Sequence, residues 1–225
     1  MSDANNNERS GQLKNPFYVS NSLNILLFFA GWGIWWSFFQ IWLTTKEGFS
    51  GAQVGEIYSF NSAFSLIMNL VYSNIQDRLG IRRNLLVFCA VLQVFLGPFF
   101  TFLFVPMLRA HFLMGALIGS CYLTLAYLSA SPMFEALTER VSRRFNYQYG
   151  SARGWGSFGY ALSALIAGFL FTIDPALLFW LGSGIAVVLL ILLLCWNPIR
   201  NEKDVAKFEN CLLYTSDAAD EGLGV

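Results

Sequence analysis

Ser73-Asn74-Ile75-Gln76-Asp77-Arg78-Leu79-Gly80-Ile81-Arg82-Arg83 is a short charged stretch between two long apolar runs. The flanking runs, at about 55–75 and 85–107, are each long enough to cross a bilayer as a helix, which takes about 20 apolar residues. Gly80 permits a tight reversal between two such helices. Asp77, at the end of the first run, can pair with nearby guanidinium groups. The stretch therefore predicts two antiparallel membrane helices joined by a short basic loop.

The composition extends this reading to the whole chain. Hydrophobic residues make up 56% of the 225 residues and charged residues only 12%, whereas soluble domains carry about 25% charged residues. Six apolar stretches of spanning length occur, at about 23–43, 55–75, 85–107, 112–137, 155–173 and 176–196. We predict an all-α membrane protein with one six-helix domain over 19–200, preceded by a cytoplasmic segment 1–18. Residues 201–225 would begin a central loop and end in an artefactual tail, because 210–225 resemble translated sequencing-adapter read-through.

The basic residues fall in alternate connections between these runs. Of the fourteen lysines and arginines, eleven lie on one side of the predicted bundle. Lys46 and Arg109 lie on the other side, and Arg153 lies inside a span. Because cytoplasmic loops are enriched in Lys and Arg, this distribution predicts a multi-pass protein of the plasma membrane with both ends in the cytoplasm.

Two opposite charges, Glu135 and Arg153, fall inside apolar runs. A charge at membrane depth costs roughly 2.5 to 17 kcal/mol on an isolated helix, so such residues usually mark a functional site. The alternative is a structural ion pair that joins the fourth and fifth helices. The two roles are compatible, because a pair that opens around a ligand can close when the site is empty.

The loop at 73–83 resembles the cytoplasmic loop signature of the major facilitator superfamily, with Ser73 where the pattern has glycine and Ile81 where it has a basic residue. The resemblance implies that the six helices form one half-bundle of that fold. It also implies that Asp77, Gly80, Arg82 and Arg83 belong to a conformational gate. Alternating access requires such contacts to form in one state and break in the other.

Residues 24–200 resemble the N-terminal half of the oligosaccharide:proton symporters, the group of the lactose, raffinose and sucrose permeases. The matching pieces include Ile41-Trp42-Leu43, Gly97-Pro98-Phe99, Tyr149-Gly150 and Phe179-Trp180-Leu181. The sequences Trp-Gly-Ser-Phe-Gly-Tyr at 155–160 and Trp35-Trp36-Ser37 are closest to the sucrose type.

This resemblance implies a sugar site near the middle of the bilayer. Glu135 would accept hydrogen bonds from sugar hydroxyls, and Arg153 would donate a bidentate pair. Tyr160 would offer an aromatic face for a pyranose ring, and Ser157 and Trp32 would complete the predicted site.

The function implied is import of a disaccharide or small oligosaccharide with protons across the bacterial inner membrane. The proton-coupling residues would belong to a C-terminal six-helix half that these 225 residues lack. The alternatives are a sugar uniporter, an exporter of the same superfamily, and a non-transporting membrane scaffold. An enzyme is not expected, because the spans hold no nucleophile–base or metal constellation. No cofactor, metal or nucleic-acid partner is expected either.

Three minor patterns complete the predictions. A polar stripe on the second span predicts either a water-filled cavity or hydrogen bonds between helices; its members are Tyr58, Asn61, Ser62, Ser65 and Asn69. A small-residue stripe on the fifth span predicts close helix packing at Ser157, Ala161, Ala164 and Gly168. The cysteines in apolar runs, Cys89, Cys121 and Cys195, are expected to be buried thiols.

Overall fold

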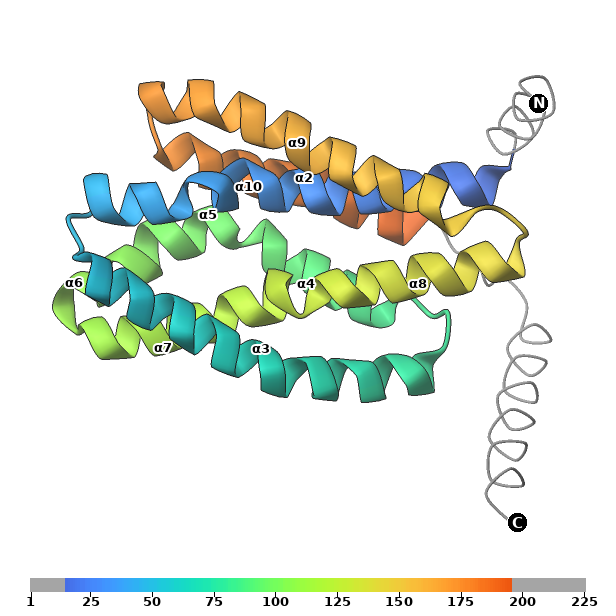
Figure 1. Cartoon of the computed structure of the whole chain (residues 1–225), viewed down its shortest axis with the longest axis horizontal. Coiled ribbons are helices and arrows are strands. Elements are labelled where there is room, and N and C mark those ends of the chain that lie inside the picture. Colours follow the sequence, from blue (N-terminus) through green and yellow to red (C-terminus); the bar gives the residue numbers. More distant parts are fainter. Residues whose placement is uncertain (1–14, 196–225) are drawn as a thin grey trace, which may run out of the picture.

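The computed structural model describes residues 15–195, which form a bundle of long helices lying side by side (Figure 1). The first two predicted spans are the uninterrupted helices α2 (Pro16–Thr45) and α3 (Gly51–Leu79). The third is broken into α4 (Asn84–Val94), α5 (Leu96–Pro98), the π-helix η1 (Phe99–Phe104) and α6 (Val105–Ala110), and the fourth into α7 (Phe112–Leu123), the π-helix η2 (Thr124–Leu128) and α8 (Ala130–Arg144). The last two are α9 (Tyr149–Ile173) and α10 (Ala176–Cys195).

The all-α prediction is confirmed for the described residues. Four or five segments among them qualify as membrane spans, compared with the six predicted. Four helical segments are long and apolar enough to cross a membrane: Pro16–Thr45, Phe112–Arg144, Tyr149–Ile173 and Ala176–Cys195. A fifth is reached if the bent pair Asn84–Val94 and Leu96–Ala110 forms one span. Helix α3 has the length, at 29 residues, but its polar stripe lowers its hydropathy. The predictions for 1–14 and 196–225 lie outside the described residues.

The bend in the third segment has a local cause. Its two parts meet at 45°, and Pro98 is the last residue of α5, the first piece after the break at Phe95. Proline has no backbone N–H and its ring clashes with the carbonyl four residues earlier, so it kinks a helix. The π-helix η1 then continues the chain from Phe99. The bend therefore belongs to one long segment that changes direction.

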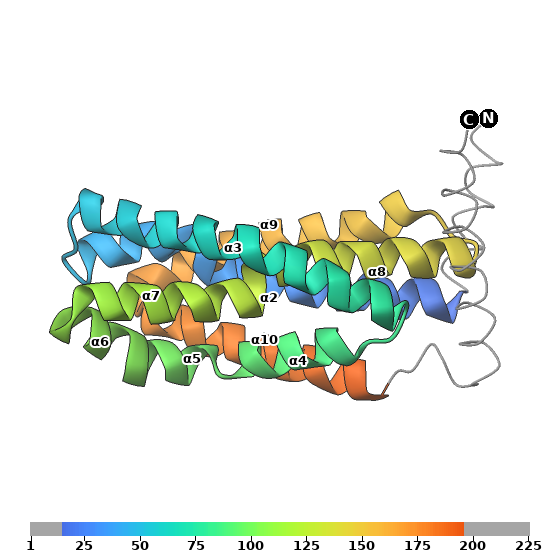
Figure 2. The ribbon, with the colours of Figure 1, turned by 90° about the horizontal axis from the view of Figure 1, so that it is seen from below.

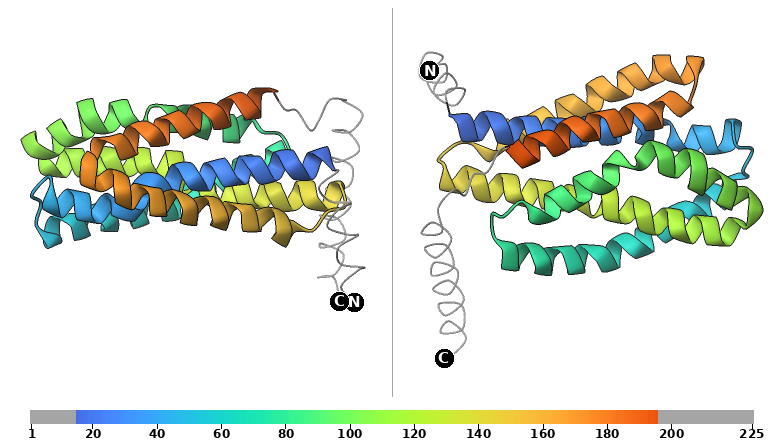
Figure 3. Two further views of the ribbon diagram at one scale, coloured as in Figure 1. Left: turned by 90° about the horizontal axis from the view of Figure 1, so that it is seen from above. Right: turned by 180° about the vertical axis from the view of Figure 1, so that it is seen from behind.

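The chain runs up and down along the bundle, so that alternate connections share an end. Figures 2 and 3 show the start of α2 and the end of α10 at the same end of the bundle as the α3–α4 and α8–α9 connections. We call this the inner end, because it carries the basic loops. The α2–α3, α6–α7 and α9–α10 connections lie at the opposite end, which we call the outer end.

Helices α2 and α9 pack closely because small residues line their contact. A Cβ added to Gly159 would lie 2.5 Å from the Leu26 carbonyl oxygen, and one added to Gly33 would lie 2.5 Å from the Ser163 hydroxyl. The buried residues of α9 are Ala152, Gly156, Gly159, Ser163 and Ala167. The predicted contact stripe was wrong for Ser157 and Ala161, which are exposed. Two small-residue stripes run along this helix, and the one that includes Gly156 and Gly159 faces α2.

An aromatic core holds α2 against the third and sixth segments. The Phe100 and Phe179 rings stack with centroids 4.2 Å apart, and Trp42 meets Phe179 edge-on at 4.7 Å. Trp35 is 1% exposed and contacts both phenylalanine rings. These contacts fix the rotation of α2 and therefore which of its aromatic residues face the opposite side.

The expectation for the cysteines is correct for only one of the three described thiols. Cys89 is buried, whereas Cys121 and Cys195 are exposed on the surface of the bundle. The inference failed because an apolar run in a membrane helix has a lipid-facing side as well as a buried side, and a thiol is tolerated on either.

Candidate functional site

The charged pair predicted in the apolar runs is formed. Arg153 Nε and Nη2 lie 2.8 Å and 2.7 Å from Glu135 Oε1. The pair joins α8 to α9, and its side chains remain 28% and 33% exposed for Arg153 and Glu135. Their approach within salt-bridge reach is therefore confirmed. The contact alone fits both the structural and the ligand-binding role.

Arg153 also contacts two further residues of the predicted site region. Its guanidinium carbon lies 4.4 Å from the centre of the Phe29 ring on α2, a cation–π geometry that stabilises the charge away from water. Its Nη1 donates to the Ser157 hydroxyl at 3.2 Å, which is reached because residues four apart share one face of a helix. The guanidinium is thereby oriented from three sides, by α2, α8 and α9.

The predicted aromatic residues lie beside this pair. Trp32 is 6.0 Å from Phe29 and meets Tyr160 edge-on at 6.4 Å, as measured between ring centroids. The Trp32 indole N–H is covered and has no hydrogen-bond partner among the described residues. The structure therefore gathers all the predicted sugar-site residues into one cluster: Trp32, Glu135, Arg153, Ser157 and Tyr160. A carboxylate acceptor, a guanidinium donor and aromatic faces are the groups needed to bind a polyol.

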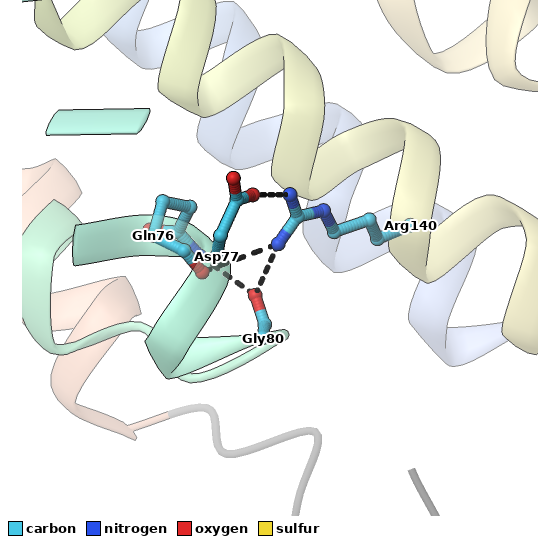
Figure 4. Close-up of polar contacts among 4 residues, drawn as sticks. All are labelled: Gln76, Asp77, Gly80 and Arg140. Carbon is cyan, nitrogen blue, oxygen red and sulfur yellow. Dashed lines mark hydrogen bonds and ion pairs between the residues drawn. The ribbon is translucent and has the colours of Figure 1, made fainter. Parts of the chain in front are cut away.

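The predicted gate residue Asp77 pairs with an arginine of another helix and not with the arginines next to it in the sequence. Figure 4 shows Arg140 of α8 beside the end of α3, where its Nη2 donates to Asp77 Oδ1. Its Nη1 lies 3.2 Å from each of the backbone oxygens of Gln76 and Gly80. Gly80 has φ +62°, a backbone conformation that glycine adopts without a Cβ clash. Arg140 thus caps the C-terminal end of α3 as an additional donor, because the Gln76 carbonyl also accepts from the Gly80 N–H at 2.9 Å and the Gly80 carbonyl also accepts from Gln76 Nε2 at 2.7 Å.

Arg82 and Arg83 are not part of this contact. Arg83 Nη2 donates to the Leu194 carbonyl at the end of α10, at 3.0 Å, and burial lowers the pKa of Arg83. Arg82 is exposed. Sequence reasoning missed Arg140, which it counted only among the basic residues of the inner end. No local signal marks it, because its partner Asp77 is 63 positions away.

A second missed group ties the start of α2 to α9. The Tyr18 hydroxyl lies 2.9 Å from the Ser151 hydroxyl and accepts a hydrogen bond from the Trp155 indole N–H at 3.1 Å. Asn21 Nδ2 donates to the Tyr147 hydroxyl at 2.8 Å. These polar side chains hold the inner ends of the two helices that carry Phe29 and Arg153.

The polar stripe on α3 makes no side-chain hydrogen bond to another helix within residues 15–195. The Ser62 hydroxyl donates to the Tyr58 carbonyl of its own helix. Asn61 is 3% exposed, and neither polar atom of its amide has a partner in the described part of the chain. Interhelical hydrogen bonding by these side chains is therefore not observed, and Tyr58 packs instead on Trp36 with ring centroids 5.4 Å apart.

A cavity of about 340 Å³ lies at the outer end, away from the ion pair. Its lining combines the aromatic core residues Trp42, Phe100 and Phe179 with charged residues of the turns. Two of these charges already have structural contacts. Glu47 Oε2 is 2.6 Å from Arg109 Nη2, and Asp174 accepts from the Ala176 N–H at 2.9 Å, at the start of α10.

Comparison with known proteins agrees with this arrangement. Residues 10–212 match the model of a family described as LacY proton/sugar symporter. The chain is 36% identical over 179 residues to a sucrose permease of Escherichia coli, covering 80% of this chain and 43% of that protein. A lactose permease of Citrobacter freundii is 41% identical over 162 residues (72% and 39%), and a raffinose permease of E. coli is 36% identical over 189 residues (84% and 44%).

The chain spans about two fifths of the length of the curated relatives it matches. The family match, by contrast, extends over all the described helices. Its description is that of a transporter family and not of an enzyme. The apolar helices, the charged pair between α8 and α9 and this match lead to one conclusion: the chain belongs to the LacY proton/sugar symporter family.

Proposed function

We propose that the chain is the N-terminal half of a longer transporter that imports a disaccharide or small oligosaccharide together with protons. The observation that carries the proposal is the half-buried Glu135–Arg153 pair between apolar helices. The names of the relatives, which are permeases for sucrose, lactose and raffinose, support a sugar as the substrate.

In this proposal the half-domain crosses the membrane six times, and α3 is the crossing that hydropathy alone does not identify. Its 29 residues are enough for a span. A polar stripe is tolerated at membrane depth where it faces a cavity or another part of the protein instead of lipid. The basic loops at the inner end support a cytoplasmic location for both ends of the chain. The membrane is then the bacterial inner membrane.

The sugar is held by exchange of hydrogen bonds at the ion pair. Sugar hydroxyls donate to Glu135 and accept from Arg153, and Ser157 keeps the guanidinium oriented when the pair opens. Tyr160 and Trp32 contact the apolar face of the first ring. Because each charge keeps an opposite charge or a hydroxyl as its partner, neither is left uncompensated in the empty or the loaded site.

Conformational change is proposed to involve the inner end. The Asp77–Arg140 contact joins α3 to α8, and α8 also carries Glu135. A contact that forms in one state and breaks in the other would couple the inner end of α3 to the helix that carries Glu135 during alternating access. The remaining sugar contacts and the proton-coupling groups are proposed to lie in a C-terminal half outside these 225 residues.

The test uses the complete open reading frame that contains this chain, expressed in cells without other disaccharide uptake. Addition of the transported sugar should cause uptake and a transient alkalinisation of the medium. Uptake that is indifferent to the pH gradient would remove the symport claim and favour the uniporter.

Variants of the pair test the site itself. Arg153→Lys keeps the charge but loses the planar fork, and loss of one hydrogen bond to a charged group, worth about 1.5–3 kcal/mol, lowers sugar affinity roughly 10- to 150-fold. Glu135→Gln should act in the same direction. Arg143→Lys, in an exposed pair with Glu139 on the same helix as Glu135, serves as the matched control. Normal sugar affinity in both site variants would reduce the pair to a structural role.

A further inference from the structure

Aromatic side chains continue from the ion pair toward the outer end of the bundle. On α2 they are Phe29, Trp32 and Trp36, which share one face because they are spaced three and four residues apart. The Trp32 ring centroid lies 6.0 Å from the ring centroids of both Phe29 and Trp36. Tyr58 of α3 and Tyr160 of α9 contact the same rings. We call these five residues the aromatic ladder.

The ladder extends beyond the residues that contact Arg153. Trp36 is seven residues after Phe29, which is roughly 10 Å along a helix axis. At this level Tyr58 packs on Trp36 with ring centroids 5.4 Å apart, and the Ser37 and Tyr160 hydroxyl oxygens lie 3.4 Å apart. Three helices therefore converge beside Trp36, about two turns from the guanidinium.

The ladder combines accessible rings with uncharged polar groups. Trp32, Trp36, Tyr58 and Tyr160 are all only partly buried. Tyr58 carries a hydroxyl on a partly buried ring, and the Trp32 N–H is an unpaired donor in the described part of the chain. A covered donor without a partner is unfavourable, so a ligand oxygen that reaches this N–H relieves a cost of the empty site.

These features fit a neutral ring with hydroxyl groups. The ladder residues beyond Phe29 are tryptophans and tyrosines, which carry no formal charge at neutral pH and so offer no counter-charge to an ionic ligand. Aromatic faces with hydroxyl or indole edges provide large contact area and a few polar groups that fix orientation. Continuity with the charged pair places such a ring directly next to one bound at Glu135 and Arg153.

We propose that Trp36 and Tyr58 form a subsite for the second ring of the sugar, which makes the site selective for disaccharides and longer saccharides over monosaccharides. The inference rests on the proposed function and deepens it. The first ring is held by the ion pair, with Tyr160 and Trp32 between the two positions. The second ring stacks on Trp36, and one of its hydroxyl groups forms a hydrogen bond with the Tyr58 hydroxyl.

The test measures binding to the purified product of the complete open reading frame in nanodiscs. Methyl α-glucoside serves as the one-ring probe and sucrose as the two-ring probe, by calorimetry. Tyr58→Phe removes only a hydroxyl, and loss of one net hydrogen bond of about 0.5–1.5 kcal/mol lowers sucrose affinity roughly 2- to 12-fold. Affinity for methyl α-glucoside stays unchanged. Trp36→Leu has the same selective effect.

Phe38→Leu is the matched control, because Phe38 is also a partly buried aromatic residue of α2 but packs against Phe171 of α9 at 5.1 Å. If Trp36→Leu fails to fold, Tyr58→Phe still decides the question. Unchanged sucrose affinity in Tyr58→Phe overturns the subsite, and so does an equal loss for both probes. Failure of the wild-type protein to bind sucrose, methyl α-glucoside, lactose and raffinose in the same assay refutes the proposed function itself, and the subsite with it.

Discussion

Removal of the Arg140 guanidinium should destabilise the bundle more than removal of the Asp77 charge. Arg140 donates to Asp77 and to two backbone oxygens at the end of α3. The carboxylate is 66% exposed and the arginine 29%, so the ion pair itself contributes only about 0–1 kcal/mol. The two bonds to carbonyls contribute about 1 kcal/mol each or somewhat more, because the donor is charged. We therefore expect about 0–1 kcal/mol for Asp77→Asn and about 2–3 kcal/mol for Arg140→Met.

The assay is unfolding of the purified chain in dodecylmaltoside micelles with increasing sodium dodecyl sulfate, followed by circular dichroism. The free energy of unfolding is compared between each variant and the wild-type chain. Arg143→Met is the control, because Arg143 is 79% exposed and pairs with Glu139 on its own helix. Such i,i+4 pairs contribute about 0.3–0.5 kcal/mol.

Two results would refute this reasoning. If Asp77→Asn costs as much as Arg140→Met, the charge pair and not the helix cap supplies the stability. If Arg140→Met costs no more than Arg143→Met, the bonds from Arg140 to the Gln76 and Gly80 carbonyls contribute nothing measurable. In either case the role of Arg140 as a cap of α3 is wrong.

The remaining predictions concern the charged pair and the glycines. Glu135→Gln or Arg153→Gln alone should lower the thermal midpoint more than the double variant does if the pair is purely structural, because only the single variants leave an uncompensated charge; equal or additive losses would argue against that role. Gly159→Ala should cost about 1–3 kcal/mol, since its Cβ would lie 2.5 Å from a backbone oxygen of α2, whereas Gly154→Ala, with open space around its Cβ, should be neutral or slightly stabilising in the same unfolding assay. Gly80→Ala should cost about 1–3 kcal/mol, because φ +62° with ψ −115° is strained for a residue with a Cβ, and an unchanged unfolding midpoint would contradict this.

Much of the fold follows from the sequence by itself. Long apolar runs must become helices in a bilayer, since backbone polar groups have no other partners there. For this reason the runs at 23–43 and 155–173 lie inside α2 and α9. The sequence also marked Glu135 and Arg153 as candidate partners, because an unpaired charge in such a run is costly. Their contact in the structure is the outcome that this cost favours.

The number of spans is less well determined by sequence. The stretch at 55–75 was read as a span from its length, but the polar stripe of α3 lowers its hydropathy, and among residues 15–195 the count stands at four or five. Hydropathy averages over all faces of a helix. It cannot separate a polar face that lies against protein from one that faces lipid.

Which residues meet across helices was decided only by the tertiary structure. Asp77 pairs with Arg140 instead of the neighbouring Arg82 or Arg83, and Tyr58 packs on Trp36. Helical periodicity shows which residues share a face, but not how each helix is rotated about its axis. That rotation is set by packing between helices, here by the contact of α2 with α9 and by the aromatic core around Trp35. Partners far apart in sequence are therefore fixed by packing and not by local pattern.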